Sequence, residues 1–85
     1  MKSNDVQLSV IARSPFHIFY EGKARMVSAA NEVGNFDVLP GHADFFSIMI
    51  AGNVIIETEP ENVSFTISNG IITVRDDEVI LFVNI

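Results

Sequence analysis

Apolar residues occupy every second position in several short segments of this chain. The segments 6–10 and 63–67 alternate strictly between large apolar and polar side chains, and the segment 79–83 keeps this rhythm with Ile80 and Phe82 added between its apolar positions. Neighbouring side chains of a strand point to opposite faces, so a period of two predicts strands with one buried face. Because the last segment is apolar throughout, we expect its strand to be covered on both faces or to meet a partner.

Turn-forming residues separate these segments. Asn69-Gly70 is expected to form a two-residue type I′ hairpin, and Gly52-Asn53 a type II′ hairpin. Glu59-Pro60-Glu61-Asn62 and Asp76-Asp77 are expected to close two more hairpins, and Glu21-Gly22 to end a strand. Turns this frequent, with no helical period between them, indicate short strands that follow one another directly.

Length and composition limit the fold and the partners. The 85 residues are enough for one domain, spanning 1–85, with a small core, and 48% hydrophobic residues exclude disorder. We therefore expect an all-β fold, an antiparallel β-sandwich or flattened barrel of about eight to ten short strands. The net charge of −6 argues against nucleic acid and anionic membrane surfaces as partners, and the absence of cysteine excludes disulfides. The polar start, Met1 to Asp5, is expected to fray.

The segment Leu39-Pro40-Gly41-His42 is expected to form a type II turn. Proline fixes φ at about −65° at the second position of such a turn, and glycine accepts positive φ at the third. His42 and Asp44 would then project from a rigid corner. Taken alone, a corner of this kind is either an ordinary solvent-facing turn or a recognition loop.

Phenylalanines supply most of the aromatic side chains. Phe19, Phe36 and Phe65 are expected in the core from their position and period. Phe45 and Phe46 are adjacent, so on a strand they point to opposite faces. One of the two should be buried, and the other is a candidate for an apolar patch that faces a partner.

No catalytic, cofactor or metal site is expected. His42 and Asp44 lack a third and fourth ligand at usable spacing, and His17 is expected on a strand, partly buried. No serine has a histidine and an acid at a recognisable spacing, and no glycine-rich phosphate loop is present. The alternating Glu57, Glu59 and Glu61 are expected to point outward, so the chain does not look like an enzyme.

The stretch from Gly34 to Ala43 reads Gly-x-Phe-x-x-Leu-Pro-Gly-His-Ala. It resembles the signature loop of the epsilon subunit of rotary, proton-driven (F-type) ATP synthases, and the order and approximate spacing of the family's segments are kept from about Val6 to Val83. The other segments that resemble the family are Leu8-Ser-Val-Ile11, Phe19-Tyr-Glu-Gly22, Met26-Val-Ser-Ala29, Ile67-Ser-Asn-Gly-Ile-Ile-Thr-Val74 and Glu78-Val-Ile-Leu81.

The sequence departs from this family at several points. Asn69 replaces the first glycine of a Ser-Gly-Gly hairpin, Ala51 stands where proline often precedes glycine, and Asn35 stands where an acidic residue is common. The sequence stops at Ile85, where the family's C-terminal pair of helices would begin. We therefore expect the N-terminal β-sandwich domain without the inhibitory C-terminal arm or its nucleotide site.

The resemblance implies a non-catalytic rotor subunit in the central stalk, which links the gamma subunit to the ring of c subunits and helps couple proton flow to ATP synthesis. It implies a peripheral place on the cytoplasmic face of a bacterial inner membrane, with no nucleic acid, no cofactor and no membrane insertion. The alternatives are a free-standing β-sandwich binding module and, from a third class, a small hydrolase or metalloprotein. By match to the family, the candidate residues are Glu32, Asn35 and His42 for the c ring, Ala43, Asp44, Phe45 and Phe46 for the gamma subunit, and Pro40, Gly41, Asn69 and Gly70 for structural turns.

Overall fold

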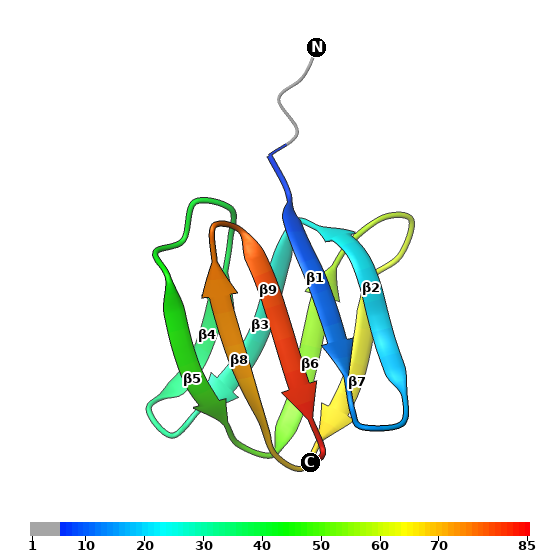
Figure 1. Ribbon diagram of the computed structural model, residues 1–85, viewed down its shortest axis with the longest axis vertical. Coiled ribbons are helices and arrows are strands. Elements are labelled where there is room, and N and C mark those ends of the chain that lie inside the picture. The colour runs from blue at the N-terminus through cyan, green and yellow to red at the C-terminus, as the bar shows by residue number, and fades with distance from the viewer. Residues whose placement is uncertain (1–5) are drawn as a thin grey trace.

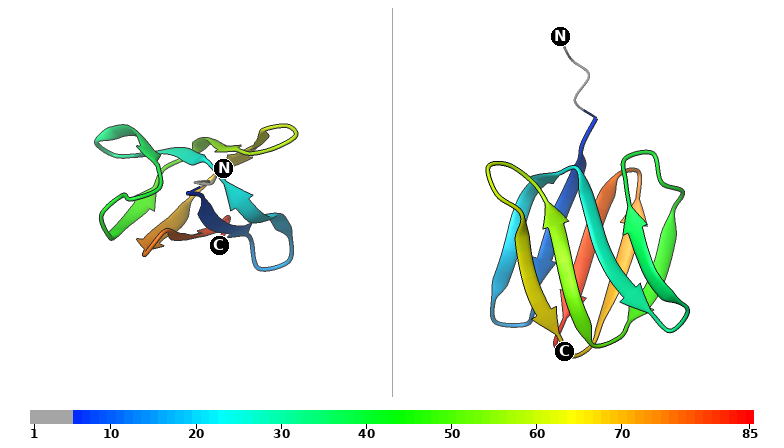
Figure 2. Two further views of the ribbon diagram at one scale, coloured as in Figure 1. Left: turned by 90° about the horizontal axis from the view of Figure 1, so that it is seen from above. Right: turned by 180° about the vertical axis from the view of Figure 1, so that it is seen from behind.

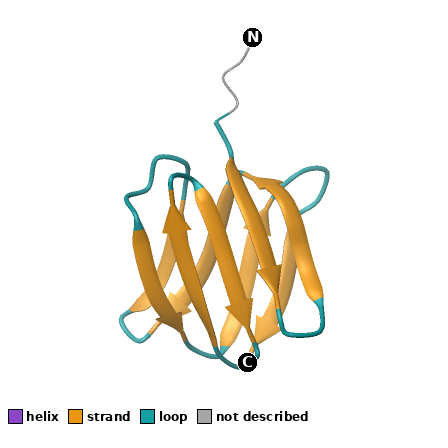
Figure 3. Ribbon diagram, viewed as in Figure 1, coloured by secondary structure: helices purple, strands orange, loops and turns teal. Residues whose placement is uncertain are grey.

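The computed structural model describes residues 6–85, and these form nine strands and no helix (Figure 3). The predicted all-β fold of eight to ten strands is therefore confirmed. The predicted fraying of Met1 to Asp5 lies outside the described residues. The strands are β1 (Leu8–Arg13), β2 (Ile18–Ala24), β3 (Met26–Asn31), β4 (Gly34–Val38), β5 (Phe45–Met49), β6 (Gly52–Glu57), β7 (Val63–Ile67), β8 (Gly70–Arg75) and β9 (Glu78–Val83).

The strands form two sheets that face each other as a sandwich (Figures 1 and 2). A five-stranded sheet has the order β2-β1-β9-β8-β5, and a four-stranded sheet has the order β4-β3-β6-β7. Figure 1 views the five-stranded sheet from its outer face, and the right-hand panel of Figure 2 views the four-stranded sheet from the other side. All pairs are antiparallel except β1 and β9, which run parallel and join the two ends of the chain.

The core lies between the sheets and is built from the alternating positions that the sequence marks. In β9, for example, Val79, Leu81 and Val83 are fully buried, whereas Ile80 and Phe82 point outward and are 48% and 37% exposed. Of the two alternatives for this strand, coverage on both faces is wrong within the described chain. The contact with a partner stays a prediction.

Two of the predicted hairpins are wrong, because the strands on either side belong to different sheets. Asn69-Gly70 leads from β7 in the four-stranded sheet to β8 in the five-stranded sheet, and Gly52-Asn53 lies at the start of β6 after the chain has left β5. Gly70 is buried, and its Cα faces the side chain of Met49. The main-chain carbonyl of Asn69 accepts a hydrogen bond from Asn84 N at 2.9 Å, so this link fastens the end of the chain.

The type I′ hairpin occurs instead at Asp76-Asp77. Both residues have positive φ, 51° and 63°, and the turn joins β8 to β9 with Arg75 opposite Glu78. This prediction of a hairpin is confirmed, as is the turn at residues 59–62, which joins the paired strands β6 and β7.

The prediction that Glu21-Gly22 ends a strand is wrong, since β2 continues to Ala24. Gly22 lies opposite Val10 in this strand, and the Tyr20 side chain covers it, so that a Cβ there would be 3.0 Å from Tyr20 Oη. Tyr20 Oη also lies 3.0 Å from Thr58 Oγ1, and this contact joins β2 to the residue that follows β6 in the other sheet. The glycine makes room for the tyrosine and does not stop the strand.

The three phenylalanines expected in the core are half-buried at the open sides of the sandwich, where they pack against its core. Phe19 of β2 stacks on Phe65 of β7 with ring centres 4.4 Å apart. Phe36 of β4 meets Phe45 of β5 edge to face at 5.3 Å. Each pair joins an edge strand of one sheet to an edge strand of the other, and these edge strands are not paired with each other through the main chain. The aromatic side chains therefore close the two sides of a small sandwich.

Candidate functional site

The Pro40-Gly41 corner has the predicted type II geometry. Gly41 has a φ of +86°, and His42 N donates to the carbonyl of Leu39 at 3.1 Å. The His42 ring packs edge to face on Phe45, with ring centres 5.4 Å apart, and its Nδ1 lies 2.7 Å from the carbonyl oxygen of Ala43. The corner is thus held internally by a turn hydrogen bond and by aromatic packing.

Two hydrogen bonds fasten this corner to the β8–β9 turn, which lies beside it in Figure 1. Gly41 N donates to Asp77 Oδ1 at 2.8 Å, and Asp76 N donates to Asp44 Oδ1 at 3.2 Å. Asp44 is exposed at the corner, as predicted, and its carboxylate also binds the neighbouring turn. Sequence reasoning missed these contacts because the partners lie more than thirty residues apart along the chain, and nothing local in their spacing indicates that they meet.

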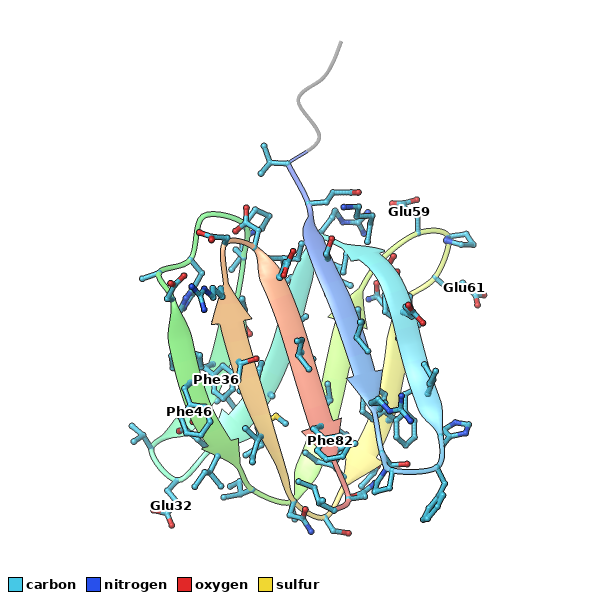
Figure 4. All side chains as sticks on the ribbon, viewed as in Figure 1. Glu32, Phe36, Phe46, Glu59, Glu61 and Phe82 are labelled. Carbon is cyan, nitrogen blue, oxygen red and sulfur yellow. The ribbon has the colours of Figure 1, made fainter. Side chains whose placement is uncertain are left out.

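The structure does not bring the three candidates for the c ring together. Glu32 is exposed in the turn between β3 and β4, and Asn35 follows near the start of β4 (Figure 4). His42 lies beyond the other end of β4, whose five residues span about 17 Å of extended chain. His42 shares its end of the sandwich with Ala43, Asp44 and Phe45, so Glu32 and Asn35 cannot form one compact site with it.

The outer surface of the five-stranded sheet is apolar across four strands. Phe46 and Ile48 of β5 are 63% and 67% exposed, and Ile80 and Phe82 of β9 also point outward. Phe46 and Phe82 are labelled in Figure 4. Strand register makes these side chains continuous, because Ile80 lies beside Ile11, and Phe82 lies opposite Ile71, which in turn lies opposite Ile48. We call this surface the apolar face, formed by Ile11, Phe46, Ile48, Ile71, Ile80 and Phe82.

The apolar face is hollowed near the β2 edge. A depression of about 370 Å³ lies over β2, β1 and β9, and Gly22, Ile11 and Ile80 are among the residues that line it. Its rim is polar: Glu21 and Glu78 line it, and Lys23 Nζ donates to Ser9 Oγ at 2.9 Å. Protein–protein interfaces commonly have an apolar centre surrounded by a polar rim.

The outer surface of the four-stranded sheet has the opposite character. It presents Asn35 and Asp37 from β4, with Ser28 Oγ of β3 donating to the Asp37 carboxylate, and Thr66 Oγ1 of β7 donates to Asn53 Oδ1 at 2.9 Å. On these four strands, as far as they are described, Ile55 is the exposed large apolar residue, at 38%. One side of the sandwich is thus suited to water and the other to a partner.

Residues 6–85 contain no group of three or more potential metal ligands. His17 is exposed in the loop before β2, where it packs on Phe19, so its predicted place on a strand is wrong. Of the three glutamates expected to point outward, Glu57 and Glu59 both pair with Arg25. Side-chain hydrogen bonds, the stronger effect being that of Glu59 and the weaker that of Glu57, raise the pKa of the Arg25 guanidinium.

Comparison with known proteins agrees with the β-sandwich fold. Residues 6–85 match the family model of the ATP synthase delta/epsilon chain, beta-sandwich domain. The chain belongs to this family. All of the described residues lie within the match, including both sheets, the Pro40-Gly41 corner and the apolar face.

Several curated relatives are ATP synthase epsilon chains. That of Sulfurimonas denitrificans is 32% identical over 71 residues, which cover 82% of this chain and 55% of the relative. That of Ruthia magnifica subsp. Calyptogena magnifica is 36% identical over 63 residues, covering 74% and 46%. The chain spans about half the length of the curated relatives it matches.

Solved structures share the fold at lower identity. A chain in the mitochondrial ATP synthase of Euglena gracilis, solved with OSCP, F1 and c-ring, superposes with a TM-score of 0.84 at 18% identity, over 96% of this chain and 53% of that one. A chain in the central stalk and c-ring of the Tetrahymena thermophila mitochondrial enzyme gives 0.76 at 14%, over 89% and 62%. In the described part of this chain, no helix is long and apolar enough to cross a bilayer.

Proposed function

We propose that this domain is a non-catalytic part of the rotor of a proton-translocating ATP synthase, where it links the gamma subunit to the ring of c subunits. The observation that carries the proposal is the contrast between the two outer surfaces, apolar on the five-stranded sheet and polar on the four-stranded sheet. A surface of exposed Ile and Phe side chains on a small acidic domain is costly in water unless a partner covers it. Membership of the family supports a subunit of the ATP synthase as that partner.

The gamma subunit is assigned to the apolar face together with the corner. Of the candidates for this contact, Phe46 is on the apolar face. Phe45 points inward, where it packs against Phe36 and against the His42 ring of the corner. Ala43 is exposed at the corner, and the Asp44 carboxylate holds the neighbouring turn. We assign His42 to this contact, because it lies at the same end of the sandwich as Ala43.

The c ring is assigned to the opposite end, at the turn between β3 and β4. Glu32 and Asn35 remain the candidates there, and both are exposed. A sandwich held between two partners in this way acts as a stiff spacer, because its close-packed core deforms little under load. We place the assembly at the cytoplasmic face of a bacterial inner membrane, as a peripheral part of the complex.

The test compares two isoleucines with similar exposure on opposite surfaces. Ile80→Ser removes an apolar side chain from the apolar face, and Ile55→Ser is the matched change on the four-stranded sheet. Binding to the purified gamma subunit of the same synthase is measured by isothermal titration calorimetry, with circular dichroism to verify the fold. We expect about tenfold weaker binding for Ile80→Ser, as the loss of one well-buried aliphatic side chain from an interface implies, and unchanged binding for Ile55→Ser. Equal effects of the two changes, or no binding by the unmodified chain, would overturn the proposal.

A further inference from the structure

The second position of the Asp76-Asp77 turn holds aspartate where glycine is usual. Both positions have positive φ, and a type I′ hairpin most often has asparagine, aspartate or glycine at the first position and glycine at the second. Aspartate tolerates this conformation less well than glycine, because its Cβ approaches the main chain. A side-chain role that glycine cannot fill would offset this cost.

The Asp77 carboxylate has such a role in the structure. Its Oδ1 accepts a hydrogen bond from Gly41 N at 2.8 Å, across 36 residues of sequence. The main-chain carbonyl of the same residue accepts Ser9 N at 2.9 Å, which fixes the turn against the start of β1. Asp77 is therefore bound to β1 through its main-chain carbonyl and to the corner through its side chain.

The amide that Asp77 binds decides the type of the corner. Types I and II differ by a flip of the central peptide of the turn, between its second and third residues. Here that peptide joins Pro40 to Gly41, and Gly41 N–H is its donor. An acceptor fixed on one side of the peptide favours the orientation that points the N–H toward it. The Asp77 carboxylate stands on the side that selects type II.

Asp44 adds a second contact in the opposite direction. Its Oδ1 accepts Asp76 N at 3.2 Å, so the corner donates to the turn and the turn donates to the corner. Hydrogen bonds from main-chain N–H groups to carboxylates are among the stronger ones in proteins. The two contacts join the corner and the turn into one rigid unit at the edge of the apolar face.

We propose that Asp77 is a positioning residue for docking: its carboxylate holds the Pro40–Gly41 peptide in the type II orientation and so fixes how the corner meets the partner. Asp44 is the second positioning residue of this unit. The inference rests on the proposed function for the identity of the partner. The hydrogen bond and its effect on the corner can be measured in the isolated chain.

The experiment separates the carboxylate from the backbone of the turn. Asp77→Gly suits the positive φ but removes the acceptor, whereas Asp77→Asn keeps an oxygen acceptor. Asp76→Gly is the matched control, because it makes the same change at the neighbouring position of the turn and leaves Asp77 in place. Amide hydrogen exchange is followed by NMR at Gly41 in all four proteins, and binding to the purified gamma subunit is measured in parallel.

We expect exchange at Gly41 about tenfold faster in Asp77→Gly, the change that corresponds to the loss of one hydrogen bond to a charged group, and a similar loss of affinity for gamma. Asp77→Asn should restore most of both, and Asp76→Gly should leave both unchanged. Exchange at Gly41 that is the same in Asp77→Gly and the unmodified chain overturns the hydrogen bond. Faster exchange with unchanged affinity overturns the docking role, and failure of the unmodified chain to bind gamma overturns the proposed function and this role with it.

Discussion

Gly41 adopts a backbone conformation that other residues reach only at a cost. Its φ is +86°, and an added Cβ would meet no heavy atom within 4 Å, so the cost of a side chain here comes from the backbone alone. We expect Gly41→Ala to lower the free energy of unfolding by more than about 1 kcal/mol. Urea unfolding with an unchanged m value measures this. Gly41→Asn should be milder, because asparagine tolerates positive φ, and a midpoint for Gly41→Ala equal to that of the unmodified chain would contradict the type II assignment.

Gly70 is required for a different reason. Its φ is not positive, but an added Cβ would lie 2.9 Å from Met49 Cε and 3.0 Å from both the Phe82 carbonyl oxygen and Val83 Cγ1. We expect Gly70→Ala to cost about 1–3 kcal/mol by overpacking the core, measured by the same urea unfolding. Gly70→Asn should be at least as harmful, in contrast to Gly41→Asn. A milder effect of Asn than of Ala at position 70 would point to backbone strain instead of packing.

These two glycines show what the sequence can and cannot reveal about single residues. Both follow a residue typical of turns, and both were predicted to serve turn geometry. For Gly41 the prediction is confirmed, because Pro40 before it specifies the turn type locally. For Gly70 it is wrong, because the space around it is set by Met49 and Val83, which reach it only in the folded sandwich.

At the scale of elements, the β8–β9 hairpin can be improved at one position. Asp76 has a φ of 51°, and its N–H, not its side chain, makes the contact with Asp44. Asparagine fits such a position better than aspartate. We expect Asp76→Asn to raise the free energy of unfolding by about 0.5 kcal/mol and the melting temperature by roughly 2–4 °C. Glu78→Gln also removes one negative charge but leaves both turn residues unchanged. An equal rise in the free energy of unfolding for this control would show that the stabilisation comes from the lost charge and not from the turn.

The strands were predictable and their pairing was not. Alternation of apolar residues marks β1, β7 and β9, because the pattern of each segment by itself indicates a strand with one buried face. Turn residues likewise mark where the chain changes direction. They do not say whether the next strand returns to the same sheet, as it does after β8, or crosses to the other sheet, as it does after β5 and β7. That choice depends on which strands can cover each other's apolar faces across the whole domain.

At the scale of the whole molecule, the candidate site was predicted in its parts and not in its arrangement. The exposed member of the Phe45-Phe46 pair and the outward apolar residues of β9 could be anticipated from the pattern. Resemblance to a family follows the order of the chain and carries no information on which end of a strand faces which partner. Glu32 and His42 flank β4 in the sequence, and this strand places them at opposite ends of the sandwich.

This separation predicts that the two contacts can be broken independently. Glu32→Lys with Asn35→Ala alters the β3–β4 turn, where both side chains are exposed, and should weaken binding to the c ring while leaving gamma binding unchanged. His42→Ala removes the ring that packs on Phe45 at the corner and should do the reverse. Both variants should fold, because changes at exposed and half-exposed positions rarely cost more than about 0.5–1 kcal/mol. Pull-downs with purified gamma and with detergent-solubilised c ring, run on the same preparations, measure both affinities. If both variants lose the same partner, the two ends of the sandwich do not serve different partners, and the assignment of the β3–β4 turn to the c ring is wrong.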